Sequence, residues 1–327
     1  MNANLHQAVR IAMAAALLAC AVAAGAQPVA YPNRPIRVIV PYPPGGGIDP
    51  LARAYAQKLN EAWGQPVLVD NKPGAATIIG TDFVAKAPAD GYTVLLTATS
   101  LTVNPAMYSK MPFDTVKDLA PISLVARFPQ LLAVNPRVPV NSVKELIDYL
   151  KAKPGSLNFP SNGNGSTQHL AGELFKFLAG VDMAHVPYKG SGPATMSVVS
   201  GETQVVFESY FILNPQIKAG KLRALAISGA ERSPLAPDLP SVAESGLPGF
   251  QHSAWAGFLA PAGTPREVTL KWYREISRIV QVPEFRERQL AQGVEPVGTT
   301  PESFTEYIRS EIAKWAGVAK NAGIKLD

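Results

Sequence analysis

The strongest constraint on this 327-residue chain is a regular alternation of short apolar segments with amphipathic ones. Residues 36–40 have the pattern of a strand and residues 49–63 that of a helix. The same pair recurs at 66–69 and 77–86, and a further strand is predicted at 93–98. Strand–helix–strand order at this spacing predicts parallel strands joined by crossover helices. We therefore predict an α/β fold.

A second series of the same kind begins after Pro121. Strands are predicted at 131–134, 157–159, 185–186 and 203–207, and helices at 142–152, 166–178 and 192–200. Two such series predict two α/β lobes, with a ligand beyond the carboxyl ends of the strands. The last third adds strands at 223–227 and 255–259 and helices at 266–280, 284–292 and 301–322, which we expect to pack back onto the first lobe.

The first 26 residues have the features of a secretory signal peptide. Arg10 precedes an apolar run that ends in the small residues Ala24-Gly25-Ala26, and that run is too short to span a bilayer. We predict cleavage after Ala26 and export to the periplasm. The sole cysteine, Cys20, follows Leu-Leu-Ala and offers lipidation as the alternative. In either case no internal disulfide forms.

Composition and charge argue against several classes of function. The net charge of +5 is small, and basic residues occur at most in pairs, so nucleic acid is not an expected partner. None of the histidines His169, His185 and His252 has a second histidine at helical metal-binding spacing, so we predict no metal and no cofactor. Nucleophile motifs of hydrolases are absent from the sequence, and we predict that the protein is not an enzyme.

The segment Pro41-Tyr42-Pro43-Pro44-Gly45-Gly46-Gly47-Ile48-Asp49 joins a predicted strand to a predicted helix. It matches neither nucleotide fingerprint, because Pro50 stands where the third glycine of G-x-G-x-x-G belongs and no Gly-Lys follows. Asp49 before Pro50 is typical of an N-cap, which predicts a helix start whose free N–H groups face an anion. A plain tight turn is the alternative.

A second loop, residues 161–169, repeats this arrangement. Its sequence is Ser-Asn-Gly-Asn-Gly-Ser-Thr-Gln-His, again between a strand and a helix, and either Ser166 or Thr167 is expected to cap the helix. Two such helix starts on different lobes can converge on one cleft, although two ordinary caps would give the same pattern. Glu208, at a predicted strand end, is placed either in the cleft or on the surface.

Several segments together resemble the Bug family, the extracytoplasmic solute receptors of tripartite tricarboxylate transporters. The resemblance covers residues 31 to 324. It rests on Tyr-Pro-Asn-Arg-Pro-Ile at 31–36, Val-Pro-Tyr-Pro-Pro-Gly-Gly-Gly at 40–47, Asn-Lys-Pro-Gly-Ala at 71–75, Asp-Gly-Tyr-Thr at 90–93, His-Leu-Ala-Gly-Glu-Leu-Phe at 169–175, His-Val-Pro-Tyr-Lys-Gly at 185–190, Lys-Ala-Gly-Lys-Leu-Arg-Ala-Leu-Ala at 218–226 and Leu-Ala-Pro-Ala-Gly-Thr-Pro at 259–265.

The resemblance implies a type II periplasmic binding protein fold, with two α/β lobes joined by crossing strands and the ligand cleft between them. Residues 27–126 with 228–327 are predicted to form one lobe, and residues 127–227 the other. A small carboxylate is the implied ligand: a di- or tricarboxylate, an acidic amino acid or an aromatic acid. Its predicted contacts are Tyr42, Gly46, Gly47, Asp49, Thr99, Ser100, Ser161, Asn162, Gly165, Ser166, Thr167, His169, Tyr188, Lys189, Gly190, Glu208 and Ser209.

The implied role is capture of the ligand by a monomeric receptor for the permease subunits in the membrane. The alternative is a sensory receptor that docks on the sensor kinase of a two-component system. The family often has Phe-Asp-Asn where this chain has Phe207-Glu208-Ser209, and Tyr-Gly or Tyr-Ala where it has Phe159-Pro160. The longer acid predicts a changed pocket volume and a different ligand.

Overall fold

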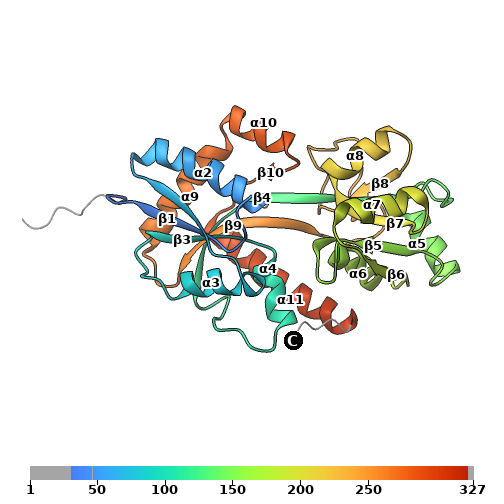
Figure 1. Cartoon of the computed structure of the whole chain (residues 1–327), viewed down its shortest axis with the longest axis horizontal. Coiled ribbons are helices and arrows are strands. Elements are labelled where there is room, and N and C mark those ends of the chain that lie inside the picture. The colour runs from blue at the N-terminus through green and yellow to red at the C-terminus, as the bar shows by residue number, and fades with distance from the viewer. Residues whose placement is uncertain (1–30, 46, 323–327) are drawn as a thin grey trace, which may run out of the picture.

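The computed structural model describes residues 31–45 and 47–322, and it consists of two α/β lobes joined by two long strands (Figure 1). Lobe 1 begins with six elements and a short 3-10 turn, η1. These are β1 (Ile36–Val40), α2 (Ile48–Trp63), β2 (Val67–Asn71), η1 (Ala75–Thr77), α3 (Ile78–Ala85), β3 (Thr93–Ala98) and α4 (Ser100–Met107). The sequence pattern predicted the first strand and β3 at their observed bounds but missed α4.

Lobe 2 contains a second series of elements. They are α5 (Val143–Ala152), β5 (Asn158–Ser161), α6 (Thr167–Ala179), β6 (Ala184–Pro187), α7 (Ser191–Ser200), β7 (Val205–Ser209), α8 (Tyr210–Lys218) and β8 (Arg223–Ile227). The signal peptide, its cleavage site and Cys20 lie outside the described residues.

The two strands that join the lobes are β4 (Leu119–Val134) and β9 (Ser253–Pro261). Residues 119–129 of β4 pair with β9 in lobe 1, and residues 130–134 pair with β7 and β8 in lobe 2. All of these pairings are antiparallel. The parallel pairing predicted for the strands of the first series is confirmed, because β1 pairs in parallel with β2 and with β3. The chain crosses to lobe 2 through β4 and returns through β9, so these two strands run in opposite directions and pair antiparallel. Among the paired strands of the described residues, β1–β2, β1–β3 and β5–β6 are parallel.

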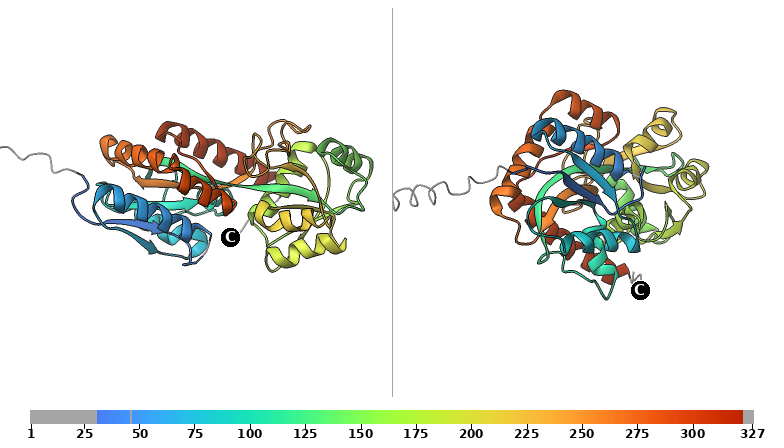
Figure 2. Two further views of the ribbon diagram at one scale, coloured as in Figure 1. Left: turned by 90° about the horizontal axis from the view of Figure 1, so that it is seen from above. Right: turned by 60° about the vertical axis from the view of Figure 1, so that its left-hand side comes forward.

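The C-terminal part consists of α9 (Arg266–Val280), α10 (Pro283–Ala291), β10 (Glu295–Pro296) and α11 (Pro301–Ala322). Helix α9 packs on lobe 1 as predicted, because Trp272, Ile276 and Ile279 belong to the cluster beneath β1 and α2. Helix α11 runs from lobe 1 toward lobe 2 (Figure 2). Trp315 near its end belongs to the hydrophobic core of lobe 2, so this helix contacts both lobes.

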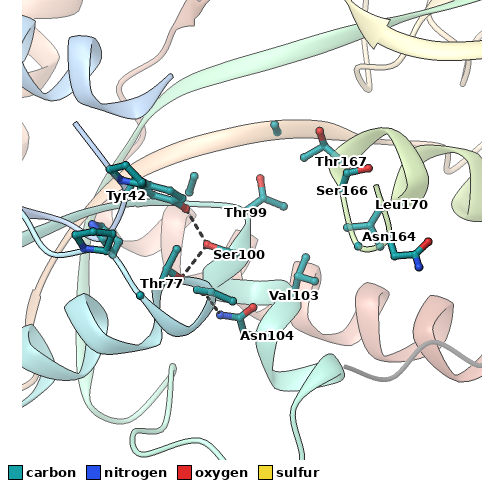
Figure 3. A pocket seen from close by; sticks show the side chains of 18 residues that line it. Tyr42, Thr77, Thr99, Ser100, Val103, Asn104, Asn164, Ser166, Thr167 and Leu170 are labelled. Atoms are coloured by element: carbon teal, nitrogen blue, oxygen red, sulfur yellow. Dashed lines mark hydrogen bonds between the residues drawn. The ribbon is translucent and has the colours of Figure 1, made fainter. Parts of the chain in front are cut away.

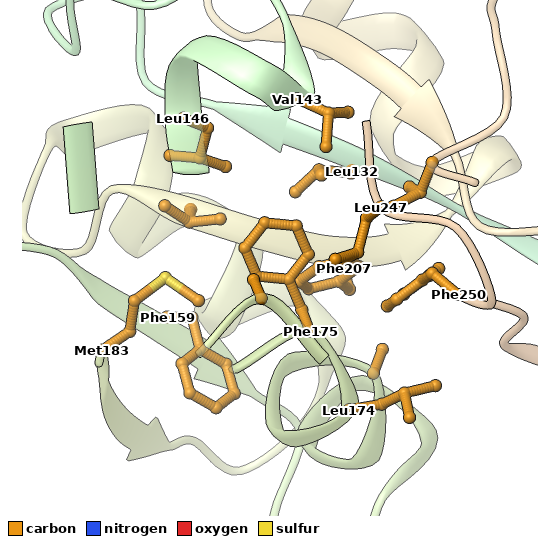
Figure 4. Packing of buried hydrophobic residues seen from close by; sticks show 14 of the residues in the cluster. Leu132, Val143, Leu146, Phe159, Leu174, Phe175, Met183, Phe207, Leu247 and Phe250 are labelled. Atoms are coloured by element: carbon orange, nitrogen blue, oxygen red, sulfur yellow. The ribbon is translucent and has the colours of Figure 1, made fainter. Parts of the chain in front are cut away.

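The core of lobe 2 also includes residues that follow β8. Val242, Leu247 and Phe250 belong to one buried cluster with Phe175 and Phe207. Figure 4 shows Leu247 and Phe250 beside the two phenylalanines. Sequence reasoning placed residues 228–252 with lobe 1, and those lobe boundaries stay a prediction. Because these three side chains bury their apolar surface against lobe 2, we propose that lobe 2 extends to Phe250.

Candidate functional site

A cavity of about 600 Å³ lies between the two lobes (Figure 3). Lobe 1 contributes residues from the ends of β1 and β3, from the loop after β2 and from α4, whereas lobe 2 contributes the loop before α6 and its first turn. The lining residues are Pro41, Tyr42, Pro43, Pro73, Gly74, Ala76, Thr77, Ala98, Thr99, Ser100, Val103, Asn104, Asn164, Gly165, Ser166, Thr167, Leu170 and Ala254.

Three hydroxyl groups meet on the lobe 1 wall. The Ser100 Oγ lies 2.7 Å from the Tyr42 hydroxyl and 3.1 Å from the Thr77 Oγ1. Burial raises the pKa of Tyr42, so its hydroxyl keeps its proton at neutral pH. Ser100 is also the first residue of α4, where backbone N–H groups have no partner within the helix. The wall therefore presents hydrogen-bond donors without a cationic side chain.

The loop beside this cluster has a strained backbone. Ala75, Ala76 and Thr77 have φ values of 43°, 50° and 80°, in the left-handed region that favours glycine. Asn104 Nδ2 donates to the Ala76 carbonyl at 2.8 Å, and the Thr77 carbonyl accepts from the hydroxyl of Thr81 at 2.9 Å. Such strain persists only where surrounding contacts hold it, and it concentrates at ligand sites.

The lobe 2 wall is the start of α6. Ser166 caps this helix as predicted, its Oγ accepting from the His169 N–H, and Gly165 and Thr167 line the cavity beside it. Gly165 N donates to His169 Nδ1 at 3.1 Å. His169 is buried, so it supports the loop from beneath and does not line the cavity.

His185 supports the same loop from the other side. Its ring stacks on that of His169 with centroids 3.9 Å apart, and its Nε2 lies 2.7 Å from Ser161 Oγ. Burial lowers the pKa of both histidines to about 4, so both are neutral at pH 7. A neutral His169 can accept the Gly165 N–H through Nδ1. Ser161 lies in this support and outside the cavity lining, whereas Asn162 is exposed.

The glycine loop before α2 differs from its prediction. Helix α2 begins at Ile48 with Gly47 at the N-cap, so Asp49 is not the cap. Asp49 is buried and accepts from Gly45 N, Arg53 and Asn71. Its carboxylate thus fixes the loop from within, and the helix start that was expected to face an anion carries this acidic residue in its first turn. Gly47 and Asp49 do not line the cavity, and Gly46 lies outside the described residues.

The remaining predicted residues lie away from the cavity lining. Glu208 is 2% exposed and accepts from Gln168 Nε2 and from the Ser209 N–H. Tyr188 N donates to the Ser161 carbonyl, and Gly190 is the N-cap of α7, with Lys189 exposed between them. The ligand roles predicted for these residues stay predictions, because the described cavity does not reach them.

Sequence reasoning missed lining residues in two places. Thr77 follows the Asn71–Ala75 motif, which carried the family resemblance but was not assigned to the site. Val103 and Asn104 belong to α4, which the sequence pattern did not reveal. Asn164 and Leu170 lie within segments already singled out, at positions where only the folded loop and the first turn of α6 show which side chain lines the cavity.

Within residues 31–45 and 47–322, no cluster of three or more histidine, cysteine, aspartate or glutamate side chains is arranged to hold a metal ion. No helix in this described part of the chain has the length and apolar character that crossing a membrane requires.

Comparison with known proteins identifies the family. Residues 51–324 match the family described as tripartite tricarboxylate transporter family receptor. The chain is 41% identical to the protein BugT of Bordetella pertussis over 298 residues, which cover 90% of this chain and 91% of BugT. It is 38% identical over 287 residues to a protein from the tcbD-tcbE intergenic region of a Pseudomonas species, covering 88% of this chain and 85% of that one.

Comparison with solved structures identifies the fold. The Rhodopseudomonas palustris protein Rpa4515 with adipate is 36% identical, with a TM-score of 0.70 over 90% of this chain and 100% of that one. A TctC solute-binding protein from Polaromonas without ligand is 30% identical, with a TM-score of 0.81 over 89% and 99%. The fold is that of a periplasmic binding protein, and this chain belongs to the receptor family of the tripartite tricarboxylate transporters.

Proposed function

We propose that this protein captures a small organic carboxylate between its lobes and presents it to the membrane subunits of a tripartite transporter. The observation that carries this proposal is the interlobe cavity, into which the starts of α4 and α6 bring backbone N–H groups and hydroxyls from opposite sides. Helix N-termini favour anions, and a carboxylate can accept several such donors at once. Among the relatives, Rpa4515 was solved with adipate and MatC of the same organism with malate.

The mechanism is closure of the lobes around the ligand. A ligand that contacts both walls stabilises the closed arrangement more than the open one, and this difference in affinity drives the change. The ligand-free Polaromonas structure superimposes better than the adipate-bound one, although its sequence identity is lower. This supports an open arrangement for the described structure. No bond of the ligand is formed or broken, so the protein acts as a receptor and not as an enzyme.

The proposed localisation is the periplasm, where such a receptor meets both solute and permease. The finer points of the proposal are the signal peptide of residues 1–26, cleavage after Ala26 and action as a monomer. Mass spectrometry of the protein purified from the periplasm tests the first two, because the mature N-terminus should be Gln27.

Ligand binding is tested by thermal unfolding and small-angle scattering with a panel of carboxylates and amino acids. At least one carboxylate should raise the melting temperature and reduce the radius of gyration. Two matched variants locate the site: Asn164→Ala should weaken binding, whereas Asn162→Ala should not, because both side chains are exposed on one loop but only Asn164 lines the cavity. No stabilisation by any panel member, or equal effects of the two variants, would contradict the proposal.

A further inference from the structure

The cavity wall is electrically unusual for a site that binds anions. None of the described residues that line it has a charged side chain. Arg53, on the nearby α2, already has partners outside the cavity lining. Its Nη2 lies 3.0 Å from Asp49 Oδ1 in an ion pair and donates to Asn71 Oδ1 at 3.2 Å. Compensation of a ligand's charge in this cavity therefore falls to hydroxyls and helix dipoles.

Two helix dipoles are available for this purpose. The first turns of α4 and α6 contain no acidic residue, and the first residues of both helices line the cavity. The third nearby helix, α2, carries Asp49 in its first turn, so its N-terminus already has a negative partner. Each free helix start is equivalent to roughly half a positive charge, so the two together compensate about one carboxylate.

Much of the remaining lining is apolar, although the amides of Asn104 and Asn164 also belong to it. Ser100 on α4 is followed three residues later by Val103, and Thr167 on α6 is followed three residues later by Leu170. Residues three apart lie on the same side of a helix, and all four of these residues line the cavity. Figure 3 shows Val103 and Leu170 coming from the two opposite walls. Each wall thus has a hydroxyl at the helix start and, one turn further, an aliphatic side chain that is largely buried and borders the cavity with only a small part of its surface.

We infer that the ligand is a monocarboxylate with an apolar body, such as an aromatic or medium-chain aliphatic acid. This inference rests on the proposed function and narrows its ligand class. The single carboxylate binds at the starts of α4 and α6, and the body packs against Val103 and Leu170. A second carboxylate on the ligand would be placed against these aliphatic side chains without a cation, which is costly for a buried charge.

Isothermal titration with a matched set of acids tests the ligand class. Hexanoate and adipate have the same carbon chain and differ by one carboxylate, while benzoate, malate and citrate extend the comparison to an aromatic and to compact polyanions. Hexanoate or benzoate should bind at least about tenfold more tightly than adipate, malate and citrate. Tighter or equal binding of any of the three polyanions overturns the inference but leaves the proposed function intact. Absence of binding by every acid overturns both.

A substitution at the apolar wall provides the second test. Val103→Thr keeps the side-chain shape and replaces one methyl group with a hydroxyl, so it should weaken the binding of hexanoate or benzoate about tenfold and leave that of malate unchanged or improved. Val116→Thr is the control, because Val116 is 40% exposed and lies outside the cavity. Leu170→Met, which remains apolar, should keep the order of preference. Unchanged affinity of the Val103 variant for the apolar acids, at an unchanged melting temperature, overturns the inference.

Discussion

The left-handed turn at Ala75–Thr77 allows a stabilising substitution to be predicted from the backbone alone. Ala76 has φ 50° and ψ 42°, and its side chain is exposed. This conformation costs a non-glycine residue roughly 1–2 kcal/mol of folding free energy. Glycine avoids that cost, but its freer unfolded chain costs about 0.5–1 kcal/mol more conformational entropy on folding. Ala76→Gly should therefore stabilise the ligand-free protein by about 0.5–1 kcal/mol. The hydrogen bond from Asn104 is unaffected, because it goes to the backbone carbonyl of residue 76.

The assay is urea and thermal unfolding of the ligand-free protein, in which the melting temperature should rise by roughly 2 °C. Ala152→Gly serves as the matched control. Ala152 is also exposed but ends the right-handed helix α5, so glycine there should lower stability by about 0.5–1 kcal/mol. The two variants thus make the same chemical change with opposite expected signs. If Ala76→Gly destabilises the protein as much as Ala152→Gly does, the turn is not strained and the reasoning fails.

Three further predictions concern the site and its supports. Ser100→Ala removes the hydroxyl that contacts Tyr42 and should weaken ligand binding about tenfold in calorimetry with an unchanged fold; unchanged affinity would place the ligand elsewhere. Glu208→Gln replaces an acceptor that holds the buried Gln168 amide, and should lower the free energy of unfolding by about 1–3 kcal/mol, measured in urea, whereas no loss would mean that the network rearranges freely. Burial lowers the pKa of His185 to about 4 from 6.5, so the unfolded chain binds more protons between these values and stability should fall as the pH drops from 6.5 toward 4. In His185→Gln the pH dependence of the melting temperature should be shallower over this window, and an identical slope would count against the assignment.

Local pattern was sufficient for most of the elements of the fold. The apolar runs at Ile36–Val40 and Thr93–Ala98 became strands at the predicted bounds, because each is fully flanked by turn-forming residues and buried within one sheet. Ser166 became the cap of α6, since a hydroxyl before a helical pattern satisfies a free N–H in almost any context. Helix α4 was missed because Pro105 interrupts its pattern and its eight residues are short for a periodicity signal.

The sequence predicted some residues of the binding site and missed others, and the difference has a physical cause. A sequence identifies helix starts and glycine-rich loops, and two of the predicted segments, around Ser100 and around Ser166, do meet across one cavity. It does not identify what an acidic side chain does at such a start. The carboxylates of Asp49 and Glu208 both accept from backbone N–H groups of their own loops. Whether such an acid supports its loop or contacts a ligand depends on neighbours that are distant in sequence.

By itself, the sequence determined the class of the fold, the two lobes, the receptor family and the helix starts available to an anion, because these follow from periodicity, capping chemistry and characteristic segments. Only the tertiary structure decided which helix starts are free, which of them face the same cavity, and that aliphatic side chains and not charged ones complete the wall. These properties depend on contacts between residues far apart in the chain, such as Arg53 with Asn71 and α4 opposite α6, and the energy of a buried charge depends on the full set of such neighbours.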